Sequence, residues 1–298
     1  MTTKPKYMTS MAPPLPKEQL VVMLLGKTGN GKSSLGNALL GRKKFQQTDG
    51  LVACQQHDPV GEEGKIASAD EVFVIDTPGV MDNVKPDEAL KGICKAISLA
   101  PNGVTAFVIV LRADSKFTED EFKAVTQLQS LFGEKFWQHV VCVFTHGDSV
   151  LKEGGRKAFF DTVETATKAI PNFKKLMNSV GERYMVVNCK NIESKQLTEF
   201  VLLINSVRRL NNSQKYTNEM FKAAQLCYEK NKGGELVARK REAKNKLQSL
   251  EAKQAQTIPE EIEELKKQLK EQEEQIKKLR ENTATAAVAK APKECVIL

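Results

Sequence analysis

Apolar runs of strand length alternate with helical periodicity over the first two thirds of the chain. The runs are LVVMLL (20–25), VFVID (72–76), TAFVIVL (105–111), VVCVF (140–144) and YMVVN (184–188). Helical patterns lie between them, at 32–41, 87–100, 118–133 and about 156–180. Strands that are apolar on both faces and separated by helices indicate a mostly parallel sheet covered by helices on both sides. The pattern therefore predicts an α/β fold for residues 20–210.

The pattern changes on both sides of this region. Residues 1–19 are polar and contain four prolines, which predicts a disordered arm. Residues 211–281 are rich in Lys, Glu and Gln and lack strand signals, so we expect a helical extension. Its apolar positions follow a spacing of three and four, with Gln272 at one inner position: Ile262, Leu265, Leu269, Ile276 and Leu279. Two interpretations stay open, a short coiled coil with a partner and a solvated helix that folds back.

A glycine-rich loop follows the first apolar run. Residues 26–34 read GKTGNGKSS, the pattern G-x-x-x-x-G-K-[ST] between a strand and a helix. Lys32 is expected to reach the β and γ phosphates of a nucleotide, and the Ser33 hydroxyl to ligate Mg²⁺. The other residues predicted to surround the phosphates are Gly26, Lys27, Thr28, Gly29, Asn30, Gly31 and Ser34. A glycine-rich turn that fits by chance is the alternative.

The second apolar run ends in Asp76-Thr77-Pro78-Gly79. In P-loop enzymes an Asp at this place holds Mg²⁺, usually through water, and the Gly79 amide would face the γ-phosphate. A simple strand-ending turn is the alternative, since D-x-P-G is favourable turn chemistry. The nucleotide interpretation is favoured because the ends of two such strands must meet at one phosphate site.

The fourth apolar run ends in Thr145-His146-Gly147-Asp148, where GTPases carry N/T-K-x-D. The Asp148 carboxylate can accept two hydrogen bonds from guanine, whereas adenine presents an acceptor there. His146 replaces the usual Lys, and we expect its ring to pack on the purine face. Asn188, at the end of the last run, stands where a final base-contacting loop belongs. These residues predict GTP and GDP as ligands; a polar loop is the alternative.

Charge and cysteine usage limit the remaining possibilities. Residues 20–210 carry 24 Lys and Arg against 22 Asp and Glu, whereas the two flanking segments together carry 21 against 15. Because the basic excess lies on the arms, it argues against a nucleic-acid groove in the globular part and favours a tail that binds to a surface. Six cysteines lack C-x-x-C spacing, and no apolar leader precedes residue 20. We expect a cytosolic protein without disulfides or structural zinc.

Taken together, these motifs resemble the AIG1-type GTPases, also called GIMAP or immune-associated nucleotide-binding proteins. The resemblance rests on GKTGNGKSSLGNALLGRKKF (26–45), DTPGV (76–80), FTHGD (144–148) and the stretch FVIVLRADSKFTEDEFKAVTQLQSLFGEKFW (107–137). It implies a GTPase related to septins and dynamins. Such proteins pair through their G domains when loaded with GTP and oligomerise on membranes, and the family has roles in immune or stress responses.

The chain departs from the family pattern around the expected catalytic groups. The family's switch-one Thr is absent before Cys54, and Thr48 is the nearest hydroxyl for Mg²⁺. Lys116 stands where the family often has an Arg that would act across a dimer, and Arg112 is the rival candidate. Val80 follows Gly79 and cannot orient a water molecule. We therefore predict slow intrinsic hydrolysis, raised by self-association.

The last four residues are Cys295-Val296-Ile297-Leu298, a C-a-a-X pattern that predicts geranylgeranylation of Cys295. Residues 282–298 form a small-residue tail, and the lysines in and before it add attraction to an anionic membrane. An unmodified tail is the alternative.

These expectations combine into a GTP-binding switch on the cytosolic face of a membrane, with slow hydrolysis that depends on dimerisation. A GTP-dependent membrane scaffold with negligible hydrolysis is the alternative. An ATP-dependent P-loop kinase is a third interpretation, which Asp148 disfavours.

Overall fold

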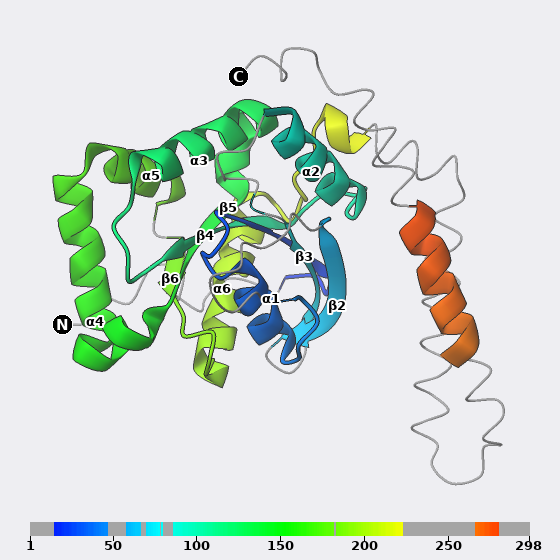
Figure 1. Cartoon of the computed structure of the whole chain (residues 1–298), viewed down its shortest axis with the longest axis horizontal. Helices are drawn as coiled ribbons and strands as arrows, with labels where there is room; N and C mark the ends of the chain where they lie inside the picture. The colour runs from blue at the N-terminus through cyan, green and yellow to red at the C-terminus, as the bar shows by residue number, and fades with distance from the viewer. Residues whose placement is uncertain are drawn as a thin grey trace, which may run out of the picture.

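The computed structural model of this chain describes residues 15–46, 58–66, 70–77, 79, 86–181, 183–222 and 266–279. Its centre is a six-stranded sheet in the order β2-β3-β1-β4-β5-β6 (Figure 1). The strands are β1 (Leu20–Leu25), β2 (Val60–Ile66), β3 (Asp70–Asp76), β4 (Ala106–Arg112), β5 (Val140–Thr145) and β6 (Tyr184–Val186). All neighbouring pairs are parallel except β2 with β3, which is antiparallel. The predicted α/β fold with a mostly parallel sheet is confirmed.

Helices cover both faces of this sheet, as Figure 1 shows. They are α1 (Lys32–Leu40), α2 (Pro86–Ser98), α3 (Glu119–Phe132), α4 (Gly147–Ala169), α5 (Pro171–Val180) and α6 (Ser194–Leu210), with a 3₁₀ helix, η2 (Glu134–His139). Side chains of α1 and α6 form one core layer with the sheet, and those of α2 to α5 form the other. Alternate residues of β1 serve the two layers: Val21 and Met23 face α2 to α5, whereas Val22 and Leu24 face α1 and α6. This two-sided burial is why the strand is apolar throughout.

Three elements differ from the expectations based on sequence. Strand β2 was not predicted because its sequence VGEEGKI has no apolar run, and as an edge strand it buries only Ile66. Helix α6 was also missed. The helical stretch expected at about 156–180 is divided at Pro171, which begins α5 because proline is tolerated in the first turn of a helix. Helix α3 begins with a capping box, in which the Thr118 side chain accepts from the Glu121 N–H and the Glu121 side chain accepts from the Thr118 N–H.

Packing against the core continues past residue 210, where we expected the globular domain to end. Val104 and Tyr216 exchange backbone hydrogen bonds of 3.0 and 2.7 Å. The Tyr216 hydroxyl donates to the Phe132 carbonyl, and the ring packs edge-on against Phe107. Phe221 is fully buried in the same layer. Residues 216–221 therefore cover the start of β4.

Residues on the two arms are described only in part. The Pro16 carbonyl accepts a hydrogen bond of 2.7 Å from Arg208 of α6, so the end of the predicted N-terminal arm lies against the domain. Residues 266–279 form a helix whose less exposed positions, Leu269, Gln272, Ile276 and Leu279, match this part of the predicted stripe. Ile262 and Leu265 lie outside the described residues. Pairing of this helix between chains stays a prediction. The predicted tail, with Cys295, lies outside the described residues.

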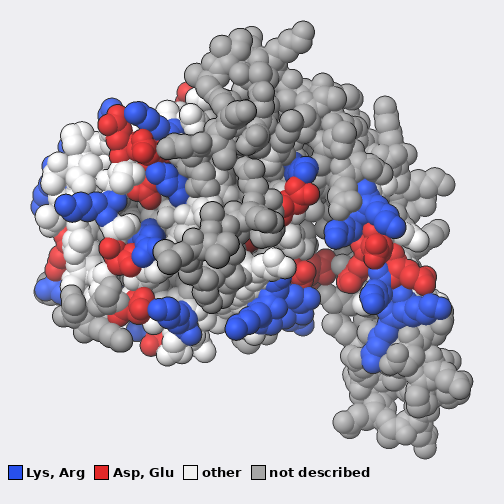
Figure 2. Space-filling view, in the orientation of Figure 1, with Lys and Arg blue, Asp and Glu red and all other residues white. Residues whose placement is uncertain are grey.

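Charge on the surface is mixed. Figure 2 shows Lys and Arg side chains interspersed with Asp and Glu over the described part of the visible face. Several of these are close pairs, such as Lys44 with Glu62 (3.5 Å) and Lys168 with Glu164 (2.6 Å). None of the described helices is both long and apolar enough to span a membrane.

Candidate functional site

The glycine loop connects β1 directly to α1 and is fitted closely against neighbouring strands. Gly31 is the N-cap of α1 in a left-handed conformation (φ 85°), which favours glycine. A Cβ atom on Gly26 would lie 2.7 Å from the Val110 carbonyl oxygen of β4, and one on Gly31 would lie 3.2 Å from the Thr145 hydroxyl. Because Gly31 has no side chain, the N-cap residue itself does not cap the first N–H groups of α1. They remain suited to an anion, which the helix dipole also favours.

Lys32 and Ser33 begin α1 directly behind this loop. The buried Lys32 ammonium donates to the carbonyls of Gly26 and Lys27, each at 2.9 Å. It therefore lies folded over the loop, on the residues that the sequence predicts to surround phosphates. The Ser33 hydroxyl donates to Asp76 Oδ2 at the end of β3, over 2.6 Å. The structure thus brings together the two metal-ligand candidates that are 43 residues apart in sequence.

Asp76 is chemically suited to a hard cation. Its Oδ1 is buried and makes no hydrogen bond, while Oδ2 accepts from Ser33. Burial raises the pKa of Asp76, against the opposing effects of the Ser33 hydrogen bond and the Lys32 charge. A carboxylate with a free oxygen beside a hydroxyl fits Mg²⁺, which prefers oxygen ligands and takes one or two from protein with the rest from phosphate and water. No cluster of three or more His, Cys, Asp or Glu suited to a metal occurs among the described residues. Thr48, the other predicted ligand, lies outside them.

The loop after β3 is described only in part. The buried Thr77 hydroxyl donates to the Leu24 carbonyl of β1 over 2.6 Å, which fixes the strand end beside the glycine loop. Gly79 is described, whereas Pro78 and Val80 are not. Recognition of a γ-phosphate by the Gly79 amide therefore stays a prediction.

The Thr145–Asp148 turn joins β5 to α4 and touches the glycine loop. The Thr145 hydroxyl donates to the Asn30 carbonyl over 2.6 Å, and Asn30 Nδ2 donates to the Val110 carbonyl over 2.9 Å. His146 has a left-handed backbone (φ 55°) as the N-cap of α4. Burial, together with the Arg112 charge, lowers the pKa of its imidazole. These contacts connect the predicted phosphate end of the site to its predicted base end.

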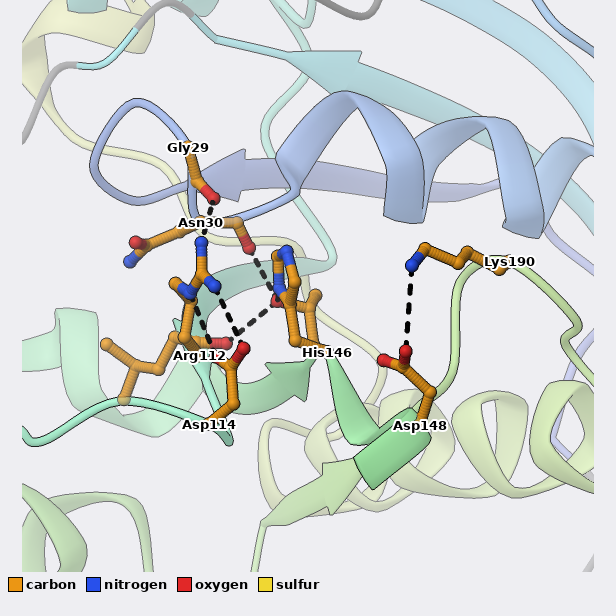
Figure 3. Close-up of polar contacts among 9 residues, drawn as sticks. Gly29, Asn30, Arg112, Asp114, His146, Asp148 and Lys190 are labelled. Carbon is orange, nitrogen blue, oxygen red and sulfur yellow. Dashed lines mark hydrogen bonds and ion pairs between the residues drawn. The ribbon is translucent and has the colours of Figure 1, made fainter. Parts of the chain in front are cut away.

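Asp148 lies in the first turn of α4, beside the loop that follows β6. Its Oδ2 lies 3.6 Å from Lys190 Nζ, and Lys190 N donates to Asn188 Oδ1 over 3.1 Å (Figure 3). Gly147 donates to the Val187 carbonyl over 3.1 Å, which holds the turn against that loop. The Asp148 side chain is 34% exposed, so its carboxylate is accessible to a ligand. Asp148 therefore lies beside the loop that contains Asn188, and contact of either residue with a base stays a prediction.

Two residues, Arg112 and Lys116, are candidates for a finger, a cation that acts on the nucleotide of a partner across a dimer. Their surroundings differ. Arg112 ends β4, and its guanidinium donates to both carboxylate oxygens of Asp114 at 2.9 Å. It also approaches the Gly29 carbonyl at 3.5 Å. Lys116 is exposed. Asp114 and Lys190 were not among the predicted site residues; the only available signal was their position just beyond strand ends.

The first strand of the sheet continues through a glycine loop into a helix that begins with Lys32 and Ser33, and Asp76 lies opposite Ser33. This arrangement defines the P-loop class of nucleotide-binding folds. Residues 20–235 match the sequence model of the AIG1 family. The chain belongs to this family.

Relatives and solved structures were also compared. From Arabidopsis thaliana, immune-associated nucleotide-binding protein 7 is 33% identical over 67% of this chain and 64% of its own length. Protein 8 of the same series is 34% identical over 71% of this chain and 60% of its own. The chain thus spans about three fifths of the length of these relatives. Toc33 from A. thaliana in complex with GDP and Mg²⁺ aligns over 66% of this chain and 86% of that one, with a TM-score of 0.47 and 21% identity.

Proposed function

We propose that the chain binds GTP and GDP with Mg²⁺ and acts as a nucleotide-controlled switch that hydrolyses GTP slowly. One observation carries the proposal: at the carboxyl ends of β1, β3 and β5, the structure gathers groups suited to both ends of a guanine nucleotide. Ser33 and Asp76 serve the phosphate end, and Asp148 serves the base end, with the Asn30–Thr145 contact between them. Membership in a family whose relatives are named nucleotide-binding proteins supports it.

Each group has a defined task in this proposal. Lys32 and the first N–H groups of α1 neutralise phosphate charge, since both already converge on the loop. Ser33 and Asp76 would hold Mg²⁺, which when bound supplies positive charge to the β and γ phosphates. Asp148 accepts hydrogen bonds from guanine, and a site built this way strongly rejects a base that cannot donate them.

Binding is tested by calorimetry of the purified protein with GDP and with ADP, with and without Mg²⁺. We expect heat with GDP and Mg²⁺ and none with ADP. Asp148→Asn should abolish the preference for guanine. Asp161→Asn, which removes the same charge from an exposed position of α4, serves as the matched control and should bind GDP as the wild type does. Equal responses to GDP and ADP, or no response to either, would refute the proposal.

Hydrolysis and assembly form the second part. We propose that G domains pair and that pairing raises a slow intrinsic rate, because Val80 supplies no water-orienting group. Single-turnover hydrolysis of GTP at rising protein concentration should accelerate, and light scattering should detect dimers with a non-hydrolysable GTP analogue. No turnover at any concentration, with dimers still formed, would favour the scaffold alternative. A rapid rate that is independent of concentration would contradict both.

Membrane attachment is a third, independent part. We propose that Cys295 is geranylgeranylated and that the basic tail strengthens binding to anionic lipid on the cytosolic face. Prenylated protein should sediment with vesicles that contain phosphatidylserine, and Cys295→Ser should remain in the supernatant after the same prenylation reaction. Equal sedimentation of the two proteins would remove this part of the proposal and leave nucleotide binding untouched. A role in immune responses, which the names of the relatives suggest, would follow only if the switch acts at such a membrane.

A further inference from the structure

The turn that reads the base departs from the GTPase pattern at one position. The motif N/T-K-x-D places a permanent cation directly after its first residue, and this chain has His146 there. Burial lowers the pKa of the His146 imidazole, so the ring is neutral at neutral pH. The preceding residue, Thr145, already contacts the glycine loop at the Asn30 carbonyl. A cation at position 146 would therefore stand beside that loop, and His146 does not supply one.

Arg112 brings a guanidinium to the same flank of the loop from a different strand. Its Nη1 lies 3.5 Å from the Gly29 carbonyl, the residue that precedes Asn30. It is also close enough to His146 to lower the imidazole pKa. Figure 3 shows Arg112 and Asp114 grouped with Gly29, Asn30 and His146, while Asp148 and Lys190 form a separate pair. Arg112 thus contacts the phosphate loop beside the turn that reads the base.

Asp114 fixes the orientation of this guanidinium. Its two carboxylate oxygens accept from Nε and Nη2 of Arg112, both at 2.9 Å, which is the planar two-bond geometry that arginine favours. The hydrogen bond from Arg112 lowers the pKa of Asp114, so the pair stays ionised at neutral pH. The orientation leaves Nη1 for the Gly29 carbonyl. A guanidinium held in this way is directed at its own chain's loop.

We propose that Arg112, oriented by Asp114, is a positioning residue for nucleotide binding that replaces the missing cation of the base-reading motif. It ties the Gly29 carbonyl of the phosphate loop to the end of β4 and so keeps the loop preorganised beside the Thr145–His146 turn. The inference rests on the proposed binding of guanine nucleotides. This positioning role differs from that of a finger, in which the Arg112 side chain would reach a nucleotide held by a second copy of the chain.

The two roles predict opposite results for GDP in the monomer. A bracing residue acts on loop geometry, so its loss accelerates GDP release without any partner. A finger touches only the transition state in a dimer, so its loss leaves GDP release unchanged and lowers turnover. Release of a fluorescent GDP analogue from dilute protein therefore distinguishes the roles.

We expect Arg112→Ala to release GDP roughly fivefold faster than the wild type, the order of one charge-assisted contact at a half-exposed site. Asp114→Asn should change the rate in the same direction by a smaller factor. Lys123→Ala, which removes an exposed cation from α3, is the control for net charge and should not change the rate. Adding His146→Lys to Arg112→Ala should restore slow release, because a permanent cation then returns to the motif.

Release from Arg112→Ala within twofold of the wild type would overturn the inference, as would failure of His146→Lys to slow release from Arg112→Ala. A melting temperature for each variant identifies those that do not fold, and Arg112→Lys then provides a milder change with the same expected direction. Hydrogen exchange of residues 26–31 in the nucleotide-free protein gives a readout that needs no ligand: exchange should accelerate in Arg112→Ala. If the wild type binds no GDP, the proposed function fails; unchanged exchange is the result that overturns the bracing role.

Discussion

Replacing Asp76 by Asn should stabilise the nucleotide-free protein and weaken its binding of Mg²⁺ and GTP. Oδ1 of Asp76 is buried without a partner, and burial raises the pKa of this carboxyl group. The ionised form is therefore a net cost to the folded state without ligand. Asn keeps the shape and can still accept the Ser33 hydrogen bond. The amide still leaves one buried polar group unpaired, but an unpaired charge costs more than the ~1–3 kcal/mol of a neutral group. We take about 1 kcal/mol for the difference because the residue is partly exposed.

For a domain of this size, about 1 kcal/mol corresponds to an increase of roughly 2–4 °C in melting temperature. The pH dependence follows from the direction of the shift. An acid whose folded pKa is raised favours folding while it is protonated, and that contribution is lost as the pH rises through the folded pKa. The stability difference between Asp76→Asn and the wild type should therefore vanish below about pH 4 and grow as the pH rises.

Ligand binding should change in the opposite direction. Loss of a carboxylate that holds Mg²⁺ directly or through water should weaken the binding of Mg²⁺ with GTP by roughly 10–100-fold. Thermal melts with and without Mg²⁺ and GTP measure both effects in one experiment, because a ligand that binds only the folded state raises its stability. A nucleotide-free Asp76→Asn protein that melts below the wild type would refute the argument from burial. Unchanged stabilisation by Mg²⁺ and GTP would refute the assignment of Asp76 to the metal.

Three further changes test the fold around the site. Tyr216→Phe should lower the free energy of unfolding by about 1 kcal/mol in chemical denaturation, because the Phe132 carbonyl loses its donor; an unchanged midpoint would contradict this. Glu199→Gln should lower the free energy of unfolding by about 2 kcal/mol, because Glu199 is 2% exposed and pairs with Arg156. Breaking a fully buried pair costs ~3–5 kcal/mol, and the 32% exposure of Arg156 reduces this cost. A gain in stability would contradict the prediction. Gly26→Ala should abolish GDP binding in calorimetry, because the new Cβ would lie 2.7 Å from the Val110 carbonyl oxygen. The control Gly41→Ala, at the end of α1 with open space around it, should only lower stability. Similar GDP binding by the two variants would argue against a steric limit at the loop.

Patterns that depend on local chemistry were predictable from the sequence. The glycine loop, Asp76 and the Thr145–Asp148 turn were found because each follows an apolar strand, and parallel strands end at one edge of the sheet. At that edge the structure places Ser33 against Asp76 and the Thr145 hydroxyl against the Asn30 carbonyl. Strand β2 could not be found in this way, because an exposed edge strand needs no apolar run and its sequence VGEEGKI contains none.

Contacts between side chains were the other gap. Arg112 was considered only as a group that acts on a partner, because sequence gives no sign that Asp114 turns it toward Gly29. Lys190 was not predicted, because its approach to Asp148 depends on how the loop after β6 packs against α4. Both relations arise from tertiary packing, which spacing along the chain does not encode.

The return of the chain to the core after α6 sets a limit on where the α/β domain can be cut from its extension. A fragment that stops at Leu210 would lack Tyr216, whose ring packs against Phe107 and whose hydroxyl donates to the Phe132 carbonyl. Such a fragment would expose an aromatic surface to water and invite aggregation. Recombinant fragments that carry the α/β domain should therefore run at least through Phe221.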